Sequence, residues 1–126
     1  MSERDIQMEI LLDHYRSPRN YGKIQNPSGE LVEYNPVCGD AVQFSFSVSG
    51  GKIEDIRFLG RGCSVSQGSA SMLTEMVKGM TLEDAMKIEP ETILSMIDLD
   101  LGPSREKCAL LSLNALHKLI RKYGDK

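Results

Sequence analysis

Three cysteines, Cys38, Cys63 and Cys108, are the residues of this chain best suited to metal or sulfur chemistry. They lie far apart in the sequence, so none of the Cys-x-x-Cys pairs that mark zinc fingers or thioredoxin-like dithiols is present. Any site that the three cysteines share must therefore be assembled by the fold from separate segments.

The first cysteine has a carboxylate close beside it. Residues 35–40 read Asn-Pro-Val-Cys-Gly-Asp, so one glycine separates Cys38 from Asp40. Gly39 can adopt backbone angles closed to other residues, which would let a thiolate and a carboxylate point toward one centre. Asp40 alone would be interpreted as a turn residue, so its candidacy depends on Cys38.

The other two cysteines have surroundings that favour the charged thiolate. Cys63 follows a glycine-rich turn and precedes a helical pattern, so N–H groups of the first helical turn should lie near its sulfur. Cys108 comes just after two cations, Arg105 and Lys107. A lone cysteine beside apolar residues is usually a packing residue, and Cys108 by itself would be interpreted that way.

Three thiolates and one carboxylate form a four-ligand set. Soft sulfur ligands favour tetrahedral zinc or a two-iron cluster and disfavour calcium and magnesium. A set of four ligands fits either a tetrahedral zinc or a two-iron cluster.

Neither His14 nor His117 is near a cysteine in sequence, so both are expected at surface or helix-end positions. A cysteine enzyme with a histidine base is therefore disfavoured.

Composition limits the class of protein. The chain has 126 residues, 40% of them hydrophobic and 26% charged, which predicts one domain, 1–126, around a single core. A net charge of −3 without a basic stripe disfavours nucleic acid as a partner. No apolar run approaches the ~20 residues needed to span a bilayer, and the start lacks signal-peptide features, so a cytoplasmic protein with reduced thiols is expected.

Apolar periodicity predicts the elements that must position these side chains. A helix is expected from Glu3 to about Tyr15, with an apolar face that comprises Ile6, Ile10, Leu11 and Tyr15. Period-two alternation predicts strands at about 31–34, 42–48 and 53–59, with a tight turn at 49–52. Ile53 differs in parity from Ile56 and Phe58, which indicates a bulge in the third strand.

The second half of the chain is predicted to be helical. One helix should run from Cys63 to near Lys78, and Thr81 should cap a short second helix. Pro90 suits the first turn of a third helix, and Ser104 can cap the last one. The fold class is therefore α+β: a three-stranded antiparallel sheet covered by helices, with an N-terminal helix and a helical C-terminal half.

Four segments resemble a known family. Asn-Pro-Val-Cys-Gly-Asp at 35–40, Gly-Arg-Gly-Cys-Ser-Val-Ser at 60–66, Arg-Glu-Lys-Cys-Ala-Leu-Leu at 105–111 and Asp-His-Tyr-Arg-Ser-Pro-Arg-Asn-Tyr-Gly at 13–22 resemble the IscU/SufU/NifU-type iron-sulfur cluster scaffolds. The similarity covers nearly the whole chain. It implies that Cys38, Asp40, Cys63 and Cys108 converge at one exposed end of the fold.

The resemblance also implies a role. Proteins of this kind accept sulfur as persulfide from a cysteine desulfurase, combine it with iron into a [2Fe-2S] cluster and pass the cluster to apo-proteins. Some members bind zinc when no cluster is present. On this view the chain is a carrier and not an enzyme, and a homodimer or trimer is expected for its cluster-bound form.

Two positions depart from the IscU branch. Lys107 stands where that branch has histidine, and 101–105 replaces its Leu-Pro-Pro-Val-Lys chaperone segment. Arg105 and Lys107 resemble the SufU branch, although the SufU insertion before the third cysteine is absent. The alternative function is therefore a zinc-dependent sulfurtransferase that stimulates a desulfurase. We predict Cys108 as the persulfide acceptor, with Cys38 next.

Overall fold

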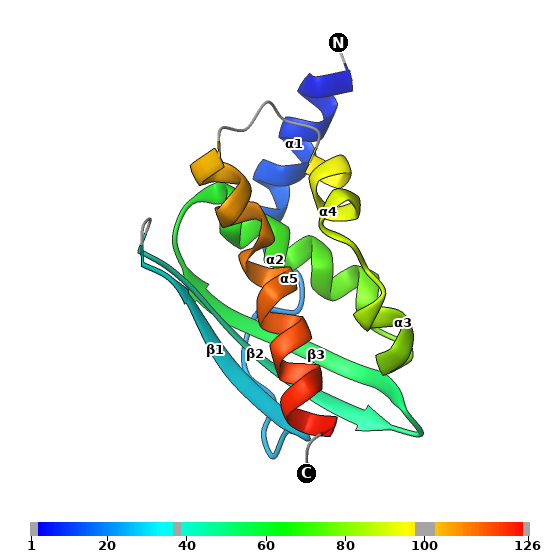
Figure 1. Cartoon of the computed structure of the whole chain (residues 1–126). Helices are drawn as coiled ribbons and strands as arrows, with labels where there is room; N and C mark the ends of the chain where they lie inside the picture. The colour runs from blue at the N-terminus through cyan, green and yellow to red at the C-terminus, as the bar shows by residue number, and fades with distance from the viewer. Residues whose placement is uncertain (1–2, 37–38, 98–102, 125–126) are drawn as a thin grey trace.

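The structure of the protein is a computed structural model that describes residues 3–36, 39–97 and 103–124, apart from the side chains of 3, 4 and 103–105. Its elements follow the expected α+β order (Figure 1). They are α1 (Glu3–Arg16), β1 (Gly29–Asn35), β2 (Asp40–Ser49), β3 (Lys52–Arg61), α2 (Ser64–Val77), α3 (Leu82–Met86), α4 (Pro90–Ile97) and α5 (Pro103–Gly124).

The sheet is antiparallel, in the order β1-β2-β3. Gly50 and Gly51 form the predicted turn between β2 and β3, with φ of 60° and 77° that glycine adopts readily. The predicted bulge is confirmed, because Ser47 pairs with Asp55 whereas Val48 pairs with Ile53. The extra residue in β3 brings Ile53 onto the same face as Ile56 and Phe58, and all three are buried.

Helices α2 and α5 contribute to the core that covers one face of the sheet (Figure 1). The strands contribute three fully buried phenylalanines, and α5 contributes buried apolar residues. These residues are Phe44, Phe46, Phe58, Ala109, Leu113 and Leu116. Because α2 and α5 are fixed on the same sheet, their N-terminal ends are held in a defined relation to the ends of the strands.

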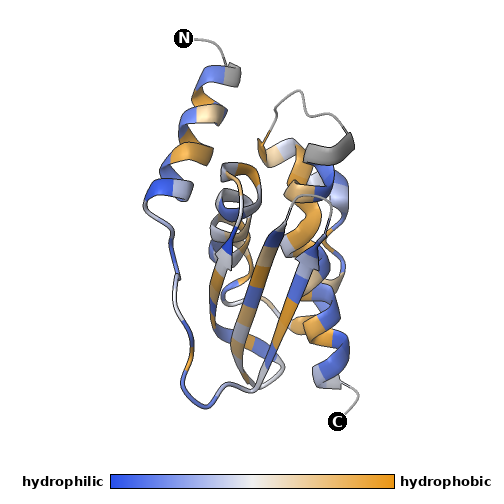
Figure 2. Cartoon of the chain, turned by 90° about the vertical axis from the view of Figure 1, so that its left-hand side faces the viewer, coloured by the Kyte–Doolittle hydropathy of each residue, from blue (hydrophilic) through white to orange (hydrophobic). Residues whose placement is uncertain are grey.

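Helix α1 extends beyond the end of the sheet, and the loop after it returns alongside the sheet (Figure 2). The helix itself is confirmed, but its expected buried face is only partly right. Leu11 is 1% exposed, whereas Ile6 is 46% and Tyr15 43% exposed. Leu11 of α1 packs closely against Gly68 of α2, since a Cβ built on Gly68 would lie only 2.5 Å from Leu11 Cδ1.

His14 lies in the last turn of α1, as the helix-end expectation has it, but it is not at the surface. His14 is buried, its Nδ1 lies 2.7 Å from Ser71 Oγ, and its Nε2 lies 3.5 Å from Glu75 Oε1. The Arg19 backbone N–H also donates to Ser71 Oγ. The Glu75 carboxylate can only accept, so it favours the histidine proton on Nε2 and leaves Nδ1 to accept from the Ser71 hydroxyl. The periodicity of α1 could not indicate partners on α2.

The helix ends mostly follow the sequence. Thr81 caps α3 by accepting a hydrogen bond from the Asp84 backbone N–H. Helix α5 begins at Pro103, one residue before the cap predicted at Ser104, because proline is pre-organised for the first helical position.

His117, within α5, is half-buried, and its Nε2 lies 3.1 Å from the Ala85 carbonyl oxygen. In the described ranges, no helix is long and apolar enough to cross a membrane.

Candidate metal centre

The fold brings Asp40, Cys63 and Cys108 together. One carboxylate oxygen and the two sulfur atoms all lie within 4.8 Å of one another. The three residues come from the start of β2, the N-terminal end of α2 and the first turns of α5. Asp40 and Cys108 are buried, and Cys63 is partly exposed. Three segments that are distant in sequence thus form one cluster of candidate ligands.

The hairpin between β1 and β2 holds Asp40 in place. Asp40 pairs with Asn35 across the two strands, and the Gly39 N–H donates to the Asn35 carbonyl at 2.8 Å. Gly39 has a φ of +72°, the left-handed conformation anticipated for it. The turn therefore delivers the Asp40 carboxylate to the end of the sheet where β3 leads into α2.

The two carboxylate oxygens of Asp40 have different environments. Oδ1 accepts a hydrogen bond of 3.2 Å from the Cys63 backbone N–H. Oδ2 is buried and has no hydrogen-bond partner among the described residues. A buried carboxylate oxygen without a partner is costly, and a cation would satisfy it. The Asp40 carboxylate, together with the two nearby sulfurs, is therefore suited to a metal.

Gly62 leaves the space that the carboxylate fills. Its φ is +142°, and a Cβ built on it would overlap the Asp40 carboxylate and lie 2.7 Å from Ser66 Oγ. Cys63 is the N-cap of α2, and the Ser66 hydroxyl donates to the Cys63 carbonyl at 3.2 Å. Cys63 thus stands at the positive end of the α2 dipole, although its side chain makes no capping hydrogen bond.

Cys108 faces the same cluster from α5. Its Sγ lies 3.9 Å from Asn35 Nδ2, a weak N–H···S contact that favours a thiolate. No disulfide joins Cys63 to Cys108, the two cysteines in the described part of the chain.

The donor set fits zinc or iron with modest adjustment. With Zn–S bonds of about 2.3 Å and Zn–O bonds of about 2.1 Å, the ligand atoms of one tetrahedral zinc stand roughly 3.6–3.8 Å apart. The present spacing of up to 4.8 Å thus requires the side chains to move closer by about 1 Å, which rotation about their χ angles supplies. Thiolate ligands also disfavour calcium and magnesium.

The remaining predicted site residues are only partly described. Cys38 and the side chain of Arg105 lie outside the described residues. Lys107 is exposed on α5, where it lines a surface hollow of about 370 Å³ together with Tyr34 and Lys118. The Cys38 ligand and the auxiliary roles of Arg105 and Lys107 stay predictions.

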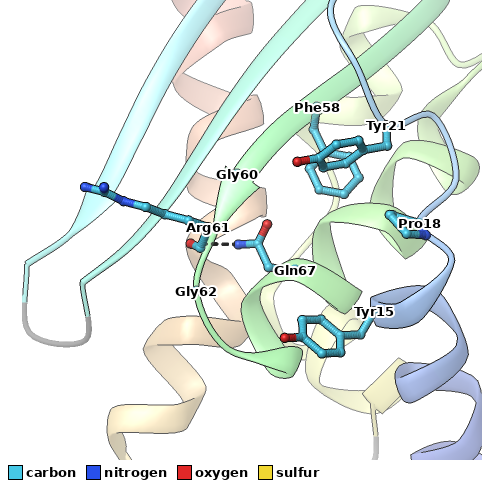
Figure 3. Close-up of a pocket in the computed structure, with 8 residues that line it drawn as sticks. All are labelled: Tyr15, Pro18, Tyr21, Phe58, Gly60, Arg61, Gly62 and Gln67. Carbon is cyan, nitrogen blue, oxygen red and sulfur yellow. Dashed lines mark hydrogen bonds between the residues drawn. The ribbon is translucent and has the colours of Figure 1, made fainter.

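A second hollow, of about 260 Å³, adjoins the Cys63 turn (Figure 3). Its lining includes Tyr15 and Tyr21 as well as Gly62 and Gln67, and Gly62 directly precedes Cys63 (Figure 3). Sequence reasoning did not select Gln67. The only signal for it was a polar residue soon after the glycine-rich turn, which does not distinguish a buried amide from an exposed one.

Comparison with known proteins gives the family. The model of the NifU-like N terminal domain matches residues 6–126. The Archaeoglobus fulgidus "Iron-sulfur cluster assembly scaffold protein IscU 1" is 37% identical over 116 residues, which cover 92% of this chain and 75% of the relative. The Bacillus subtilis "Zinc-dependent sulfurtransferase SufU" is 36% identical, over 90% of this chain and 88% of the relative.

Solved structures agree in fold. A putative iron-sulfur cluster assembly scaffold protein for the SUF system from Fervidobacterium islandicum superposes with a TM-score of 0.76 at 27% identity, covering 94% of this chain and 99% of that one. A nitrogen-fixing NifU-like protein (N-terminal) from Brucella abortus, 18% identical, gives a TM-score of 0.77 over 98% and 99% of the two chains. With the family model matched over residues 6–126, the chain belongs to the NifU-like N-terminal domain family.

Proposed function

We propose that this protein, as one domain of residues 1–126, is a scaffold on which an iron-sulfur cluster is assembled before transfer to apo-proteins. The observation that carries the proposal is the convergence of Asp40, Cys63 and Cys108, with Asp40 Oδ2 buried and unsatisfied among the described residues. Relatives 37% and 38% identical, from Archaeoglobus fulgidus and Aquifex aeolicus, are named as such scaffold proteins.

The cluster is the cargo of this site. Cys38, Cys63 and Cys108 would bind iron through sulfur, and Asp40 would bind through a carboxylate oxygen. A carboxylate matches iron in a sulfide-bridged cluster less well than a thiolate does. Asp40 would therefore be the ligand that exchanges most easily, which suits a carrier that must release what it holds.

Sulfur would arrive from a cysteine desulfurase as a persulfide. The acceptor thiolate attacks the outer sulfur of the partner's persulfide, a new S–S bond forms on the acceptor, the old S–S bond breaks and the partner's thiolate leaves. We assign Cys108 as the acceptor and Cys38 as the alternative. Because Cys108 is 1% exposed, transfer to it requires the covering segments to move aside.

A zinc-dependent sulfurtransferase is the second candidate function. Lys107 beside Cys108 favours it, and the 36% identical Bacillus subtilis relative carries that name. In this function zinc would be bound by the same thiolates and carboxylate, and the protein would accept sulfur and stimulate a desulfurase without building clusters. Both candidate functions use the same ligands. They differ in what the site passes on, which is a cluster for the scaffold and sulfur for the sulfurtransferase.

Anaerobic reconstitution with iron, cysteine and a desulfurase distinguishes the two. A scaffold acquires the visible absorption of a [2Fe-2S] cluster, loses it when apo-ferredoxin is added, and elutes as a dimer or trimer when loaded. A sulfurtransferase stays colourless, retains one zinc and accelerates desulfurase turnover. If neither a cluster nor zinc binds and turnover does not change, both candidates are excluded.

A further inference from the structure

The side-chain amide of Gln67 bridges the two strands that lead into the metal cluster. Its Nε2 lies 3.0 Å from the Arg61 carbonyl oxygen and 3.5 Å from the Ala41 carbonyl oxygen, and also 3.1 Å from Ser66 Oγ. Gln67 is 8% exposed and extends from the first turn of α2 toward the end of β3 (Figure 3). One buried amide thus contacts β2, β3 and its own helix.

The chemistry of these neighbours requires the NH₂ group. A carbonyl oxygen only accepts hydrogen bonds, so the group that faces Arg61 and Ala41 must donate. The amide oxygen of Gln67 cannot take that place, nor can a carboxylate of the same shape. The arrangement is therefore specific to a side chain with two N–H donors at this distance from α2.

The two carbonyls stand next to the proposed ligands. Ala41 and Arg61 face each other as the final pair of the β2–β3 ladder, beyond which no further pair of these strands is described. Ala41 directly follows Asp40, and Arg61 is separated from Cys63 only by Gly62. The amide therefore joins the two backbones where they leave the sheet and turn toward the metal cluster.

Gly60 makes room for this bridge. A Cβ built on Gly60 would lie 2.5 Å from Gln67 Oε1 and 2.6 Å from the Ala41 carbonyl oxygen. Both contacts are closer than carbon atoms tolerate. The glycine and the amide thus form one packed unit, and a larger residue at either position would displace the other.

We propose that Gln67 is a positioning residue that sets the separation between the Asp40 carboxylate and the Cys63 sulfur, and through it the metal affinity of the site. The inference rests on the proposed metal site. A purely structural role would instead be to fill a polar corner between sheet and helix. Substitution of Gln67 distinguishes the two roles. If Gln67 only fills the corner, its loss changes the free energy of unfolding; if it positions the ligands, its loss changes metal binding.

Cobalt(II) titration of the metal-free protein tests the proposal, since cobalt bound to thiolates gives ligand-field bands that report coordination geometry. Gln67→Met keeps the length of the side chain and removes its donors; Gln67→Glu keeps its shape and also removes them. We expect both variants to bind cobalt about tenfold more weakly than wild type, with altered bands, as for other residues that orient metal ligands.

Thr74→Val is the matched control. Thr74 is also buried and hydrogen-bonded on α2, but it contacts the loop at Asn20 and not the cysteine cluster. We expect it to lower the free energy of unfolding without changing the cobalt spectrum. Equal cobalt affinity and bands in wild type and both Gln67 variants would overturn the inference, as would an equal loss in Thr74→Val. A wild-type protein that binds no cobalt would contradict the metal site itself.

Discussion

The backbone N–H of Cys63 donates a hydrogen bond of 3.2 Å to Oδ1 of Asp40, so the fold itself joins two proposed ligands. The bond uses one carboxylate oxygen and leaves Oδ2 without a partner among the residues described. Part of the ordering that metal binding requires is therefore already present in the fold, which lowers the entropic cost of binding.

Asp40→Ala should separate metal binding from folding. The substitution removes a costly unpaired oxygen but also the acceptor for the Cys63 N–H, and these effects offset, so the unfolding free energy of the metal-free protein should change by less than about 1 kcal/mol. Zinc affinity should fall at least about tenfold, because a ligand is lost. Competition with a chromophoric chelator and urea unfolding measure the two quantities. Unchanged zinc affinity, with cluster decay equal to wild type, would contradict the assignment of Asp40.

Gly62→Ala tests the space beside the carboxylate. Gly22→Ala is its control, because Gly22 has nearly the same φ, +139°, with no described atom within 4 Å of an added Cβ. Both changes should cost about 1–3 kcal/mol of stability through backbone strain. Only Gly62→Ala should also reduce zinc affinity, since its methyl displaces Asp40. Equal zinc binding by the two variants would show that the methyl is accommodated without moving the ligand.

Some local features of the backbone could be predicted from the sequence. The positive φ of Gly39, the N-cap position of Cys63 and the bulge in β3 each follow from a few adjacent residues. Convergence of the segments around 40, 63 and 108 was expected from family resemblance and not from periodicity. The structure brings the described members together.

Gly68→Ala tests how α1 is held. Alanine should gain about 1 kcal/mol from helix propensity, but its methyl would lie 2.5 Å from Leu11 Cδ1 and 2.9 Å from the Leu11 carbonyl oxygen. Overpacking of this kind costs about 1–3 kcal/mol, so net destabilisation is expected. Limited proteolysis should cut within α1 sooner than in wild type. A more stable variant with unchanged proteolysis would mean that the two helices separate at no cost.

Stability should decrease in mild acid because of His14. Burial lowers the pKa of His14 below its ordinary 6.5, and the Arg19 charge adds to this, while Glu75 and Asp13 oppose it. Since the folded pKa lies below the unfolded one, the stabilisation is fully present above 6.5 and is lost as the pH falls through the lowered folded pKa.

Urea unfolding across this pH window measures the effect of His14. His14→Asn should flatten the dependence, because its amide oxygen can accept from Ser71 without titrating. Burial also lowers the pKa of His117, so a smaller slope of the same sign should remain. An identical slope in wild type and His14→Asn would exclude His14 as its source.

Long-range polar contacts explain what the sequence did not reveal. His14 of α1 meets Ser71 of α2, and Gln67 of α2 meets the Ala41 backbone on β2. Periodicity measures which face of an element is apolar, and α1 shows its limit, because Ile6 and Tyr15 are exposed while His14 is buried. Which polar groups find partners depends on the packing of whole elements and cannot be obtained from one segment.

The central claim is that the thiolates of Cys38, Cys63 and Cys108 and one carboxylate, that of Asp40, hold a single inorganic group. The most direct test is metal and acid-labile sulfide analysis, with a visible spectrum, on protein purified and reconstituted without oxygen, beside Cys38→Ser, Cys63→Ser and Cys108→Ser. The account predicts two irons and two sulfides per cluster in wild type, and their loss in each variant. Iron and sulfide retained equally in all three variants would contradict it.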